Sequence, residues 1–367
     1  MKNLKTDKSN RIINFIKRLL PSILGILFAL IVAEVCLRSF ALRNSLLLYP
    51  TQLQLEEFKN YTPKDSEEIE IRQFQEGFAV SHFRGDGDRF TGAVNIENAP
   101  NVLILGDSFV EAVQVEDSHT MGAVIERLAA KESKPVNVHQ YGWGGVSTAT
   151  YLAIADAVKQ RWNPQRVAVV FNGDDFSEIS LATGRFWRME INAETLSYKV
   201  VPVQRIAERF DSQLERVGFT STDVYKLVNH SALLYLVIEK YLLSKNSPDK
   251  NQNNENSAKD SSEQKIVTSI IVKALKEAYG EKLLIIYIPQ ISVNSNKEYE
   301  PAENFLQSAC ENENVNFIST RNAMINKRDK ENLLSQGFFN TPPGVGHLNQ
   351  IGHEVVAEEI WKKISNY

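Results

Sequence analysis

The sequence of 367 residues contains few cysteines, and its two cysteines, Cys36 and Cys310, stand far apart. They can form neither an internal disulfide framework nor a thiol-ligated zinc site, so stability must come from packing. A strong net charge is also missing, because 41 Lys and Arg residues stand against 45 Asp and Glu residues, for a formal charge of -4. Without a basic stripe interleaved with aromatic residues, a nucleic-acid partner is not expected.

A nucleotide-binding fingerprint is lacking too. The glycines of GWGG at residues 142–145 do not have the G-x-G-x-x-G spacing at a helix start that holds a pyrophosphate. No internal repeat of fixed period is visible. We therefore expect no cofactor, and the chemistry considered below needs no metal ion.

Only one long hydrophobic run is present, near the N-terminus. A basic segment at residues 1–18 precedes the apolar segment 19–38, which has about the length that a bilayer core needs (~18 to 20 residues). The positive-inside rule then places the N-terminus in the cytoplasm and the chain after Arg38 outside it. A cleaved signal peptide is the alternative, but the run is longer than a usual h-region and no clean A-x-A site follows. We predict an uncleaved, single-pass membrane anchor with an extracytoplasmic domain.

The remaining chain is interpreted as an extension followed by one large domain. Residues 39–100 are mixed and polar, which is typical of a linker and N-terminal extension. Within them the sequence EIEIRQFQEGFAVSHF, residues 68–83, alternates as a short β-hairpin does. The main domain is expected to span residues 101–367.

Apolar strands alternate with amphipathic helices in this domain. Strands that are apolar throughout and alternate with helices require a parallel sheet covered on both faces. We predict a three-layer α/β/α domain with about five parallel strands in flavodoxin-like order. The predicted strands lie at 102–105, 136–140, 166–171, 282–289 and 315–319, and the predicted helices at 119–131, 147–162, 264–280, 301–314 and 349–364.

An insertion at residues 176–264 interrupts the alternation. It contains a segment at 185–203 that suits a hairpin, then two amphipathic helices, and a polar stretch at about 245–264 that we expect to be disordered. An insertion here would lie above the carboxyl ends of the strands. It could form a lid or substrate wall, or it could decorate the edge of the domain, and both interpretations stay open.

Polar residues follow the predicted strands at the edge where ligands of open parallel sheets bind. Gly106-Asp107-Ser108 comes directly after the first strand and before a helix, where free backbone N–H groups favour developing negative charge. Taken alone, this tripeptide could be a capping turn. The loops after later strands carry glycines at 140–148, amides and carboxylates at 171–178, and a histidine at 342–353. Their convergence predicts one site around Ser108.

In this order the motifs resemble the GDSL or SGNH hydrolase family, in particular its bacterial membrane-anchored, extracytoplasmic members. The resemblance spans about residues 102–361 and is specific in its first and last blocks. It implies that Ser108 is the nucleophile and His347 the general base, because a serine hydroxyl needs a base to take its proton. It also implies that the N–H groups of Ser108 and Gly145 form part of the oxyanion hole.

The sequence departs from the family in the third block. The family has an asparagine side chain as its third oxyanion donor, whereas Asp174 stands there in this chain. An ionised Asp174 would repel the oxyanion, and one such donor is worth about 2.7 to 4 kcal/mol. Asp174 could be protonated, Asn172 could replace it, or backbone N–H groups could suffice. We favour Asn172, which lies only two residues away.

A second departure concerns the acid that orients the histidine. The family has an aspartate shortly before this histidine, but Gly344, Val345 and Gly346 occupy those positions, and upstream there are only Asn340 and Thr341. We therefore predict a Ser–His dyad of modest activity, with a backbone carbonyl holding the ring. In a serine-protease triad, changing the carboxylate to an amide lowers turnover by about 10⁴-fold.

The other histidines are interpreted as structural residues. One of them lies within the predicted closing helix, and the others lie in a hairpin, at a helix start, in a strand and in the insertion. In the same order, they are His353, His82, His119, His139 and His230.

Three functional hypotheses follow. The first is a membrane-anchored serine esterase that removes acyl groups from cell-envelope glycans or similar molecules through an acyl-enzyme. The second is an O-acyltransferase in polysaccharide modification, with polysaccharide-assembly proteins as partners. The third is a catalytically degenerate protein that binds a glycan or acts as a scaffold; the two departures add weight to it but leave the esterase as the first hypothesis.

Overall fold

The computed structural model describes residues 19–36, 69–73, 76–84, 87–92, 95–172, 187–192, 194–202, 233, 257–293 and 300–365. The chain forms two compact units, one of Met1–Arg43 with Gln213–Asp249 and one of Asn44–Ser212 with Lys250–Tyr367. In the first unit the helix Leu19–Cys36 has 18 residues and a mean hydropathy of 2.4. By length and composition this helix could cross a membrane.

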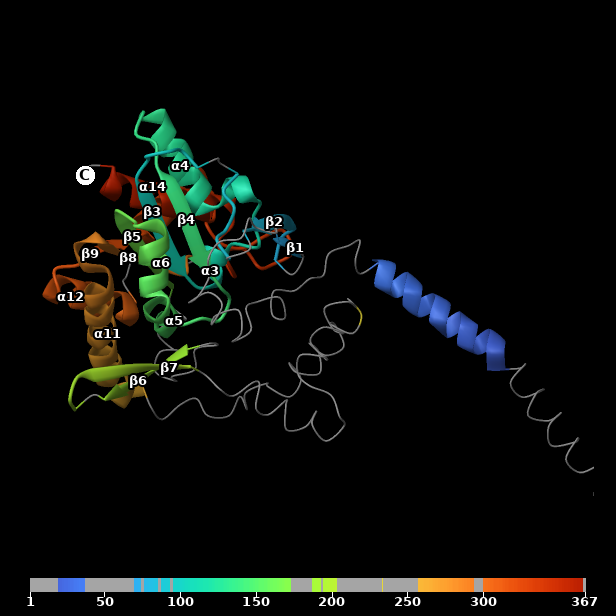
Figure 1. Ribbon diagram of the computed structural model, residues 1–367, viewed down its shortest axis with the longest axis horizontal. Helices are drawn as coiled ribbons and strands as arrows, with labels where there is room; N and C mark the ends of the chain where they lie inside the picture. Colours follow the sequence, from blue (N-terminus) through green and yellow to red (C-terminus); the bar gives the residue numbers. More distant parts are fainter. Residues whose placement is uncertain are drawn as a thin grey trace, which may run out of the picture. The chain divides into compact units, whose positions relative to one another are not determined.

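The second unit is built on a five-stranded parallel sheet (Figure 1). Its spatial order is β4-β3-β5-β8-β9, and every neighbouring pair is parallel. This is the flavodoxin-like order, so the predicted fold class is confirmed. The strands are β3 (Asn101–Gly106), β4 (Asn137–Gly142), β5 (Arg166–Asn172), β8 (Leu283–Ile288) and β9 (Asn316–Ser319).

Helices cover both faces of this sheet (Figure 1). Successive strand residues point to opposite faces, so Leu103 and Leu105 pack in one core cluster while Val102 and Ile104 pack in the other. Each such fully buried side chain contributes about 1.5 to 3 kcal/mol. The first cluster contains α5 (Thr148–Ala153), α6 (Ala155–Trp162), α11 (Ser257–Tyr279) and α12 (Pro301–Asn312), and the second contains α4 (Met121–Lys131), α13 (Arg321–Glu331) and α14 (Gln350–Ile364).

Two predicted helix boundaries need correction, and one helix was missed. The helix expected at 147–162 is divided at Ile154, because the Tyr279 hydroxyl donates to the carbonyl oxygen of Tyr151 (2.7 Å) and occupies the acceptor that a continuous helix would use. Helix α11 begins at Ser257, so the prediction of disorder at 257–264 is wrong. No glycine or proline interrupts this polar stretch, and it extends the packed helix by further turns. Helix α13 was not predicted, because only three of its eleven residues are buried.

The described part of the insertion is a hairpin of β6 (Trp187–Asn192) and β7 (Ser197–Pro202), as predicted. The side chain of Asn192 closes its turn by accepting from the N–H groups of Glu194 and Thr195 (3.0 Å each). The hairpin packs on α5, where the Ser147 hydroxyl donates to the Trp187 carbonyl (3.2 Å). The two predicted helices of the insertion and residues 245–256 lie outside the described residues, except for Leu233.

The extension before residue 101 is more than the linker that we predicted. The hairpin of β1 (Ile69–Gln73) and β2 (Ala79–Phe83) is present. Beyond it, the Arg89 N–H donates to the Gln140 carbonyl (2.9 Å), and Asp88 accepts from the Gln140 N–H (2.8 Å). These contacts along β4 bury Asp88 and Arg89 completely. The described residues between 76 and 92 therefore belong to the domain itself.

Three short helices complete the described part of the domain: α3 (Ser108–Glu111), η2 (Asp117–His119) and η4 (Gly280–Lys282).

Candidate active site

The turn that carries Ser108 is formed by close packing at the end of β3. A Cβ atom on Gly106 would lie 2.2 Å from Val110 Cγ2, so only glycine lets α3 fold back on the strand. Asp107 then caps α3, because its Oδ1 accepts from the Phe109 N–H (2.9 Å). Ser108 is the first residue of this helix and lies partly exposed at the carboxyl edge of the sheet.

The glycines after β4 allow both a close approach and a positive φ, as predicted. A Cβ atom on Gly142 would lie 2.0 Å from the backbone nitrogen of Glu111, so the end of β4 packs directly on α3. Gly145 has a φ of 72°. A Cβ atom on Gly144 would lie 3.8 Å from Ser108 Cβ, whereas one on Gly145 would meet no atom of the described residues within 4 Å. Gly144 is thus the glycine nearer to Ser108.

The structure brings Ser108 and His347 together although they are 239 positions apart. His347 Nε2 lies 2.7 Å from Ser108 Oγ. The His347 ring also packs against Phe109, the residue after the serine, with 5.1 Å between ring centroids. The serine hydroxyl can therefore donate its proton directly to the imidazole, which is the geometry that general-base activation requires.

The acid of this site is Glu76, which our sequence analysis missed. Glu76 Oε2 accepts from His347 Nδ1 (2.6 Å) and also from the His347 backbone N–H (3.0 Å). An ionised carboxylate is only an acceptor, so it keeps the proton on Nδ1 and leaves Nε2 free to accept from Ser108. The predicted dyad is wrong: the three side chains form a Ser–His–Glu chain.

Glu76 reaches His347 from a turn between β1 and β2, 271 positions away in sequence. The Gly77 N–H donates to Asn340 Oδ1 (2.7 Å), which joins this turn to the histidine loop. Asn340 therefore holds the segment that carries the acid. Thr341 bonds within its own loop, where it accepts from the Phe338 N–H (2.7 Å). No local sequence pattern marks Glu76, because its partner is distant.

Gly346 provides the space that the carboxylate of Glu76 needs. Its φ is 105°, and a Cβ atom there would lie 2.9 Å from Glu76 Oε1. We expect Gly346→Ala to push the carboxylate away from His347 and to reduce catalytic turnover by about 10²-fold, as a misplacement of about 1 Å can do. Steady-state hydrolysis of a p-nitrophenyl ester measures this. The control is Gly92→Ala, also at positive φ (82°) but with no described atom within 4 Å; equal losses in both variants would mean that backbone strain alone is responsible.

The electrostatics of the pair favour an imidazole that readily accepts a proton. Burial lowers the pKa of His347, but the hydrogen bond and charge of Glu76, together with nearby carboxylate charges, outweigh it, so the pKa lies above its ordinary value. The charges of Asp107 and Glu111 act in the same direction. Burial raises the pKa of Glu76, but its hydrogen bonds from His347 outweigh this and lower it. Glu76 is therefore ionised at neutral pH.

Asn172 lies beside the serine turn, at the end of β5. Its side chain is buried, and its Nδ2 donates to Asp107 Oδ2 (2.7 Å). Burial raises the pKa of Asp107, while hydrogen bonds from the Phe109 N–H and from Asn172 lower it, so the net shift is upward. The contact places the Asn172 amide one hydrogen bond from Asp107, the residue before Ser108. Asp174 lies outside the described residues.

Two of the other described histidines form side-chain hydrogen bonds with carboxylates. His82 bonds Asp117 Oδ2 (2.6 Å), and His139 bonds Asp88 Oδ2 (2.9 Å) while its ring stacks on Trp162. His353 is buried inside α14, where burial lowers its pKa to about 3 and keeps it neutral. His119 lies in η2, and His230 lies outside the described residues.

In the described part of the chain, no group of three or more His, Cys, Asp and Glu side chains could hold a metal ion.

Comparison with known proteins gives only distant likenesses. No family model and no curated protein matches the chain. It is similar to the solved structure of an acetyl xylan esterase, with 14% sequence identity and a TM-score of 0.38 over 72% of this chain and 99% of the other. It is also similar to a lipase/acylhydrolase from Enterococcus faecalis, with 13% sequence identity and a TM-score of 0.39 over 73% of this chain and 96% of the other. A third similar structure is the psychrotrophic esterase EstA from Pseudoalteromonas sp., with 11% sequence identity and a TM-score of 0.33 over 72% of this chain and 97% of the other. Values of this size carry no conclusion about activity, which must rest on the site.

Proposed function

We propose that this protein is a serine ester hydrolase of the SGNH type. One observation carries the proposal: Ser108, His347 and Glu76 form a continuous hydrogen-bonded chain, with 2.7 Å from serine to imidazole and 2.6 Å from imidazole to carboxylate. They come from the start of α3, the loop before α14 and the turn before β2. A structural role would not require three distant segments to present these groups in this order. The completed chain also weakens the hypothesis of a catalytically degenerate scaffold.

The proposed reaction proceeds through an acyl-enzyme. Ser108 Oγ attacks the ester carbonyl while His347 Nε2 takes its proton, and the imidazolium then protonates the departing alcohol oxygen. In the second half, a water molecule attacks the acyl group while His347 Nε2 takes a proton from the water. The imidazolium then returns this proton to Ser108 Oγ, which leaves as the acid is released. Glu76 holds the ring in the reactive tautomer and stabilises the imidazolium throughout.

The oxyanion of each tetrahedral intermediate needs donors beside Ser108. We propose the N–H groups of Ser108 and Gly145 and the side chain of Asn172 for this role, as the family resemblance and the sequence imply. The position of Asn172 supports the assignment, because its amide lies one hydrogen bond from Asp107, the residue before the nucleophile. Gly144 is the alternative glycine, since it lies nearer to Ser108.

We propose acyl esters of cell-envelope glycans, or similar envelope molecules, as the substrate class. The apolar helix Leu19–Cys36, which follows a basic segment, supports a membrane anchor with the catalytic unit outside the cytoplasm. Protease treatment of intact spheroplasts tests this topology: the unit after the helix should be digested. A catalytic unit that is protected until the cells are lysed would contradict it.

Covalent labelling tests the proposed function directly. The full-length protein in detergent micelles is treated with a fluorophosphonate, and the adduct is located by mass spectrometry of its peptides. We expect a single adduct on Ser108 and hydrolysis of short p-nitrophenyl esters. A protein that forms no adduct and releases no p-nitrophenol would contradict the proposal, as would an adduct that forms on another serine.

Hydrolysis and acyl transfer share the same acyl-enzyme and differ only in the acceptor. Supplying an acetyl donor with and without a soluble glycan separates them. We expect free acid as the main product in both cases. If acylated sugar forms faster than free acid, the protein is an O-acyltransferase.

A further inference from the structure

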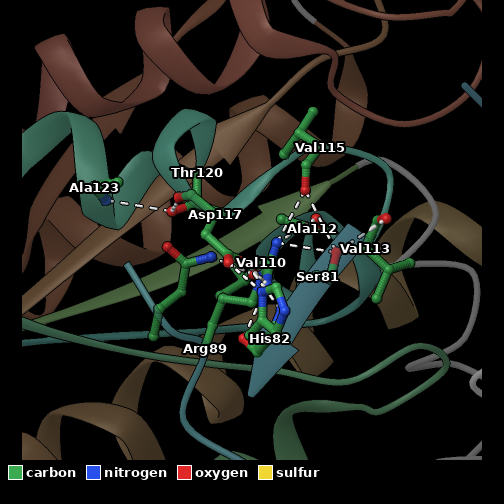
Figure 2. A network of polar contacts seen from close by, with 11 residues as sticks. Ser81, His82, Arg89, Val110, Ala112, Val113, Val115, Asp117, Thr120 and Ala123 are labelled. Carbon is green, nitrogen blue, oxygen red and sulfur yellow. Dashed lines mark hydrogen bonds and ion pairs between the residues drawn. The ribbon is translucent and has the colours of Figure 1, made fainter. Parts of the chain in front are cut away.

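Arg89 is a completely buried guanidinium between two segments of the active site (Figure 2). On the side of β2 it donates to the carbonyl of His82 (2.9 Å) and to the hydroxyl of Ser81 (3.0 Å). On the side of α3 it donates to the carbonyls of Ala112 (3.5 Å) and Val115 (2.9 Å). The planar guanidinium group of Arg89 therefore joins the β2 strand to the chain that follows α3.

These two segments carry the two residues that His347 must meet at the same time. Strand β2 begins three residues after Glu76, and α3 begins at Ser108 and ends just before Ala112. Ala112 has a φ of 57° at the end of this single turn. A shift of β2 relative to α3 would therefore move the carboxylate and the nucleophile apart.

Asp117 completes the arrangement as the counter-ion of Arg89. Its Oδ1 accepts from Arg89 and from the His82 backbone N–H (2.9 Å), and its Oδ2 bonds the His82 ring (2.6 Å). The guanidinium also lies over the ring of Phe83, 4.9 Å from its centroid. Figure 2 shows the resulting network, in which Ser81, His82 and Asp117 surround Arg89. Each of these side-chain contacts of Arg89 is made to β2 or to the segment that follows α3.

Stability alone is a weak reason for such a residue. Burial lowers the pKa of Arg89 to about 10, although the charge and hydrogen bond of Asp117 act in the opposite direction. An apolar side chain of similar volume often gives equal or greater stability than a buried ion pair. What an apolar contact does not provide is a defined direction, whereas the guanidinium of Arg89 fixes the position of β2 through several hydrogen bonds, beside those that Ser81 and His82 make to the chain after α3.

We propose that Arg89 is a positioning residue for the reaction, which holds Glu76 at its hydrogen-bond distance from His347 by locking β2 to the serine helix. The inference rests on the proposed function, and it names a residue that the sequence motifs do not include. Arg89 touches none of the reacting atoms and acts only through Glu76.

The test compares Arg89→Gln with Glu76→Gln in the full-length protein. The first readout is the His347 ring, followed by NMR of selectively labelled histidines over about pH 5 to 9. Glu76 raises the pKa of His347, and Asp107 and Glu111 contribute in the same direction. We expect both variants to lower this pKa, because Glu76→Gln removes the carboxylate charge beside the ring and Arg89→Gln moves the carboxylate away from it. The second readout is fluorophosphonate labelling, which should be about 10²-fold slower in Arg89→Gln.

Two further variants make the result decisive. Arg84→Gln is the matched control, since Arg84 lies on the same extension and pairs with buried Asp88 (2.8 Å), away from α3. It should leave the pKa of His347 and the labelling rate unchanged. Arg89→Lys retains the positive charge but loses the planar, multidentate guanidinium. It replaces Arg89→Gln in the test if that variant does not fold, and it should still lower the pKa of His347.

The double variant Glu76→Gln/Arg89→Gln should label no more slowly than Glu76→Gln alone, since both substitutions remove the same contact. The inference is overturned if the pKa of His347 stays at its wild-type value in the Arg89 variants. Multiplied losses in the double variant would overturn it as well. Failure of the proposed function gives a different result: the wild-type protein forms no adduct, while the pKa of His347 is still lower in the Arg89 variants than in wild type.

Discussion

Replacing Ser108 with alanine is expected to abolish fluorophosphonate labelling and to lower ester hydrolysis by about 10⁶-fold. The substitution removes the oxygen that lies 2.7 Å from His347 Nε2, so no acyl-enzyme can form. Loss of one small, partly exposed hydroxyl should leave the fold intact, since Ser108 is already at the surface of the sheet edge. Steady-state kinetics with a p-nitrophenyl ester and intact-protein mass spectrometry after labelling measure both effects.

Ser147→Ala is the matched control for this substitution. Ser147 follows β4, and its hydroxyl bonds the Trp187 carbonyl (3.2 Å) in the insertion hairpin. We expect this variant to label and to hydrolyse esters at the wild-type rate. If Ser108→Ala retained substantial activity, the hydrolysis would belong to another group and the assignment of the nucleophile would be wrong.

Replacing Glu76 with glutamine is expected to lower turnover by about 10³- to 10⁴-fold, close to the loss caused by the amide in a serine-protease triad. The amide can donate to His347 Nδ1, which favours the tautomer with the proton on Nε2. In that tautomer the nitrogen that faces Ser108 Oγ at 2.7 Å cannot accept the serine proton. The KM for a small ester should change little, because Glu76 bonds the imidazole and not the reacting oxygen.

The same variant should also change the pH profile. His347 acts as a base only when neutral, so activity rises with pH through its pKa. Glu76 raises that pKa, and its loss should therefore move the rising limb of kcat/KM to lower pH while the plateau falls. Glu76→Asp, which keeps the charge, should lie between wild type and Glu76→Gln. Glu97→Gln, on an exposed part of the same extension, should match wild type; a rising limb that does not move in Glu76→Gln would contradict this account.

The fold could be predicted from the sequence because it depends on local patterns. The alternation of apolar strands with amphipathic helices is written into consecutive residues, and a parallel sheet with right-handed connections leaves few possible orders. Ser108 and His347 could be predicted because their motifs resemble those of the SGNH family and each stands directly beside the end of a predicted strand or the start of a predicted helix. The carboxyl ends of parallel strands meet at one edge, which brings such loops together.

The acid could not be predicted in the same way. The expected position held Gly344, Val345 and Gly346, and the sequence therefore indicated a dyad. Glu76 lies in an ordinary hairpin turn, and nothing within ten residues of it distinguishes it from the other glutamates of the extension. Its role depends on where the β1–β2 hairpin docks, which the Gly77–Asn340 hydrogen bond and the contacts of Arg89 determine.

The sequence by itself thus determined the sheet, its covering layers, and the serine and histidine of the site. Only the tertiary structure decided that the segment before residue 101 belongs to the domain and supplies the third member of the chain. The physical reason is the range of the interactions. Periodicity and turn chemistry act over a few residues, whereas the hydrogen bond from His347 to Glu76 joins positions 271 residues apart.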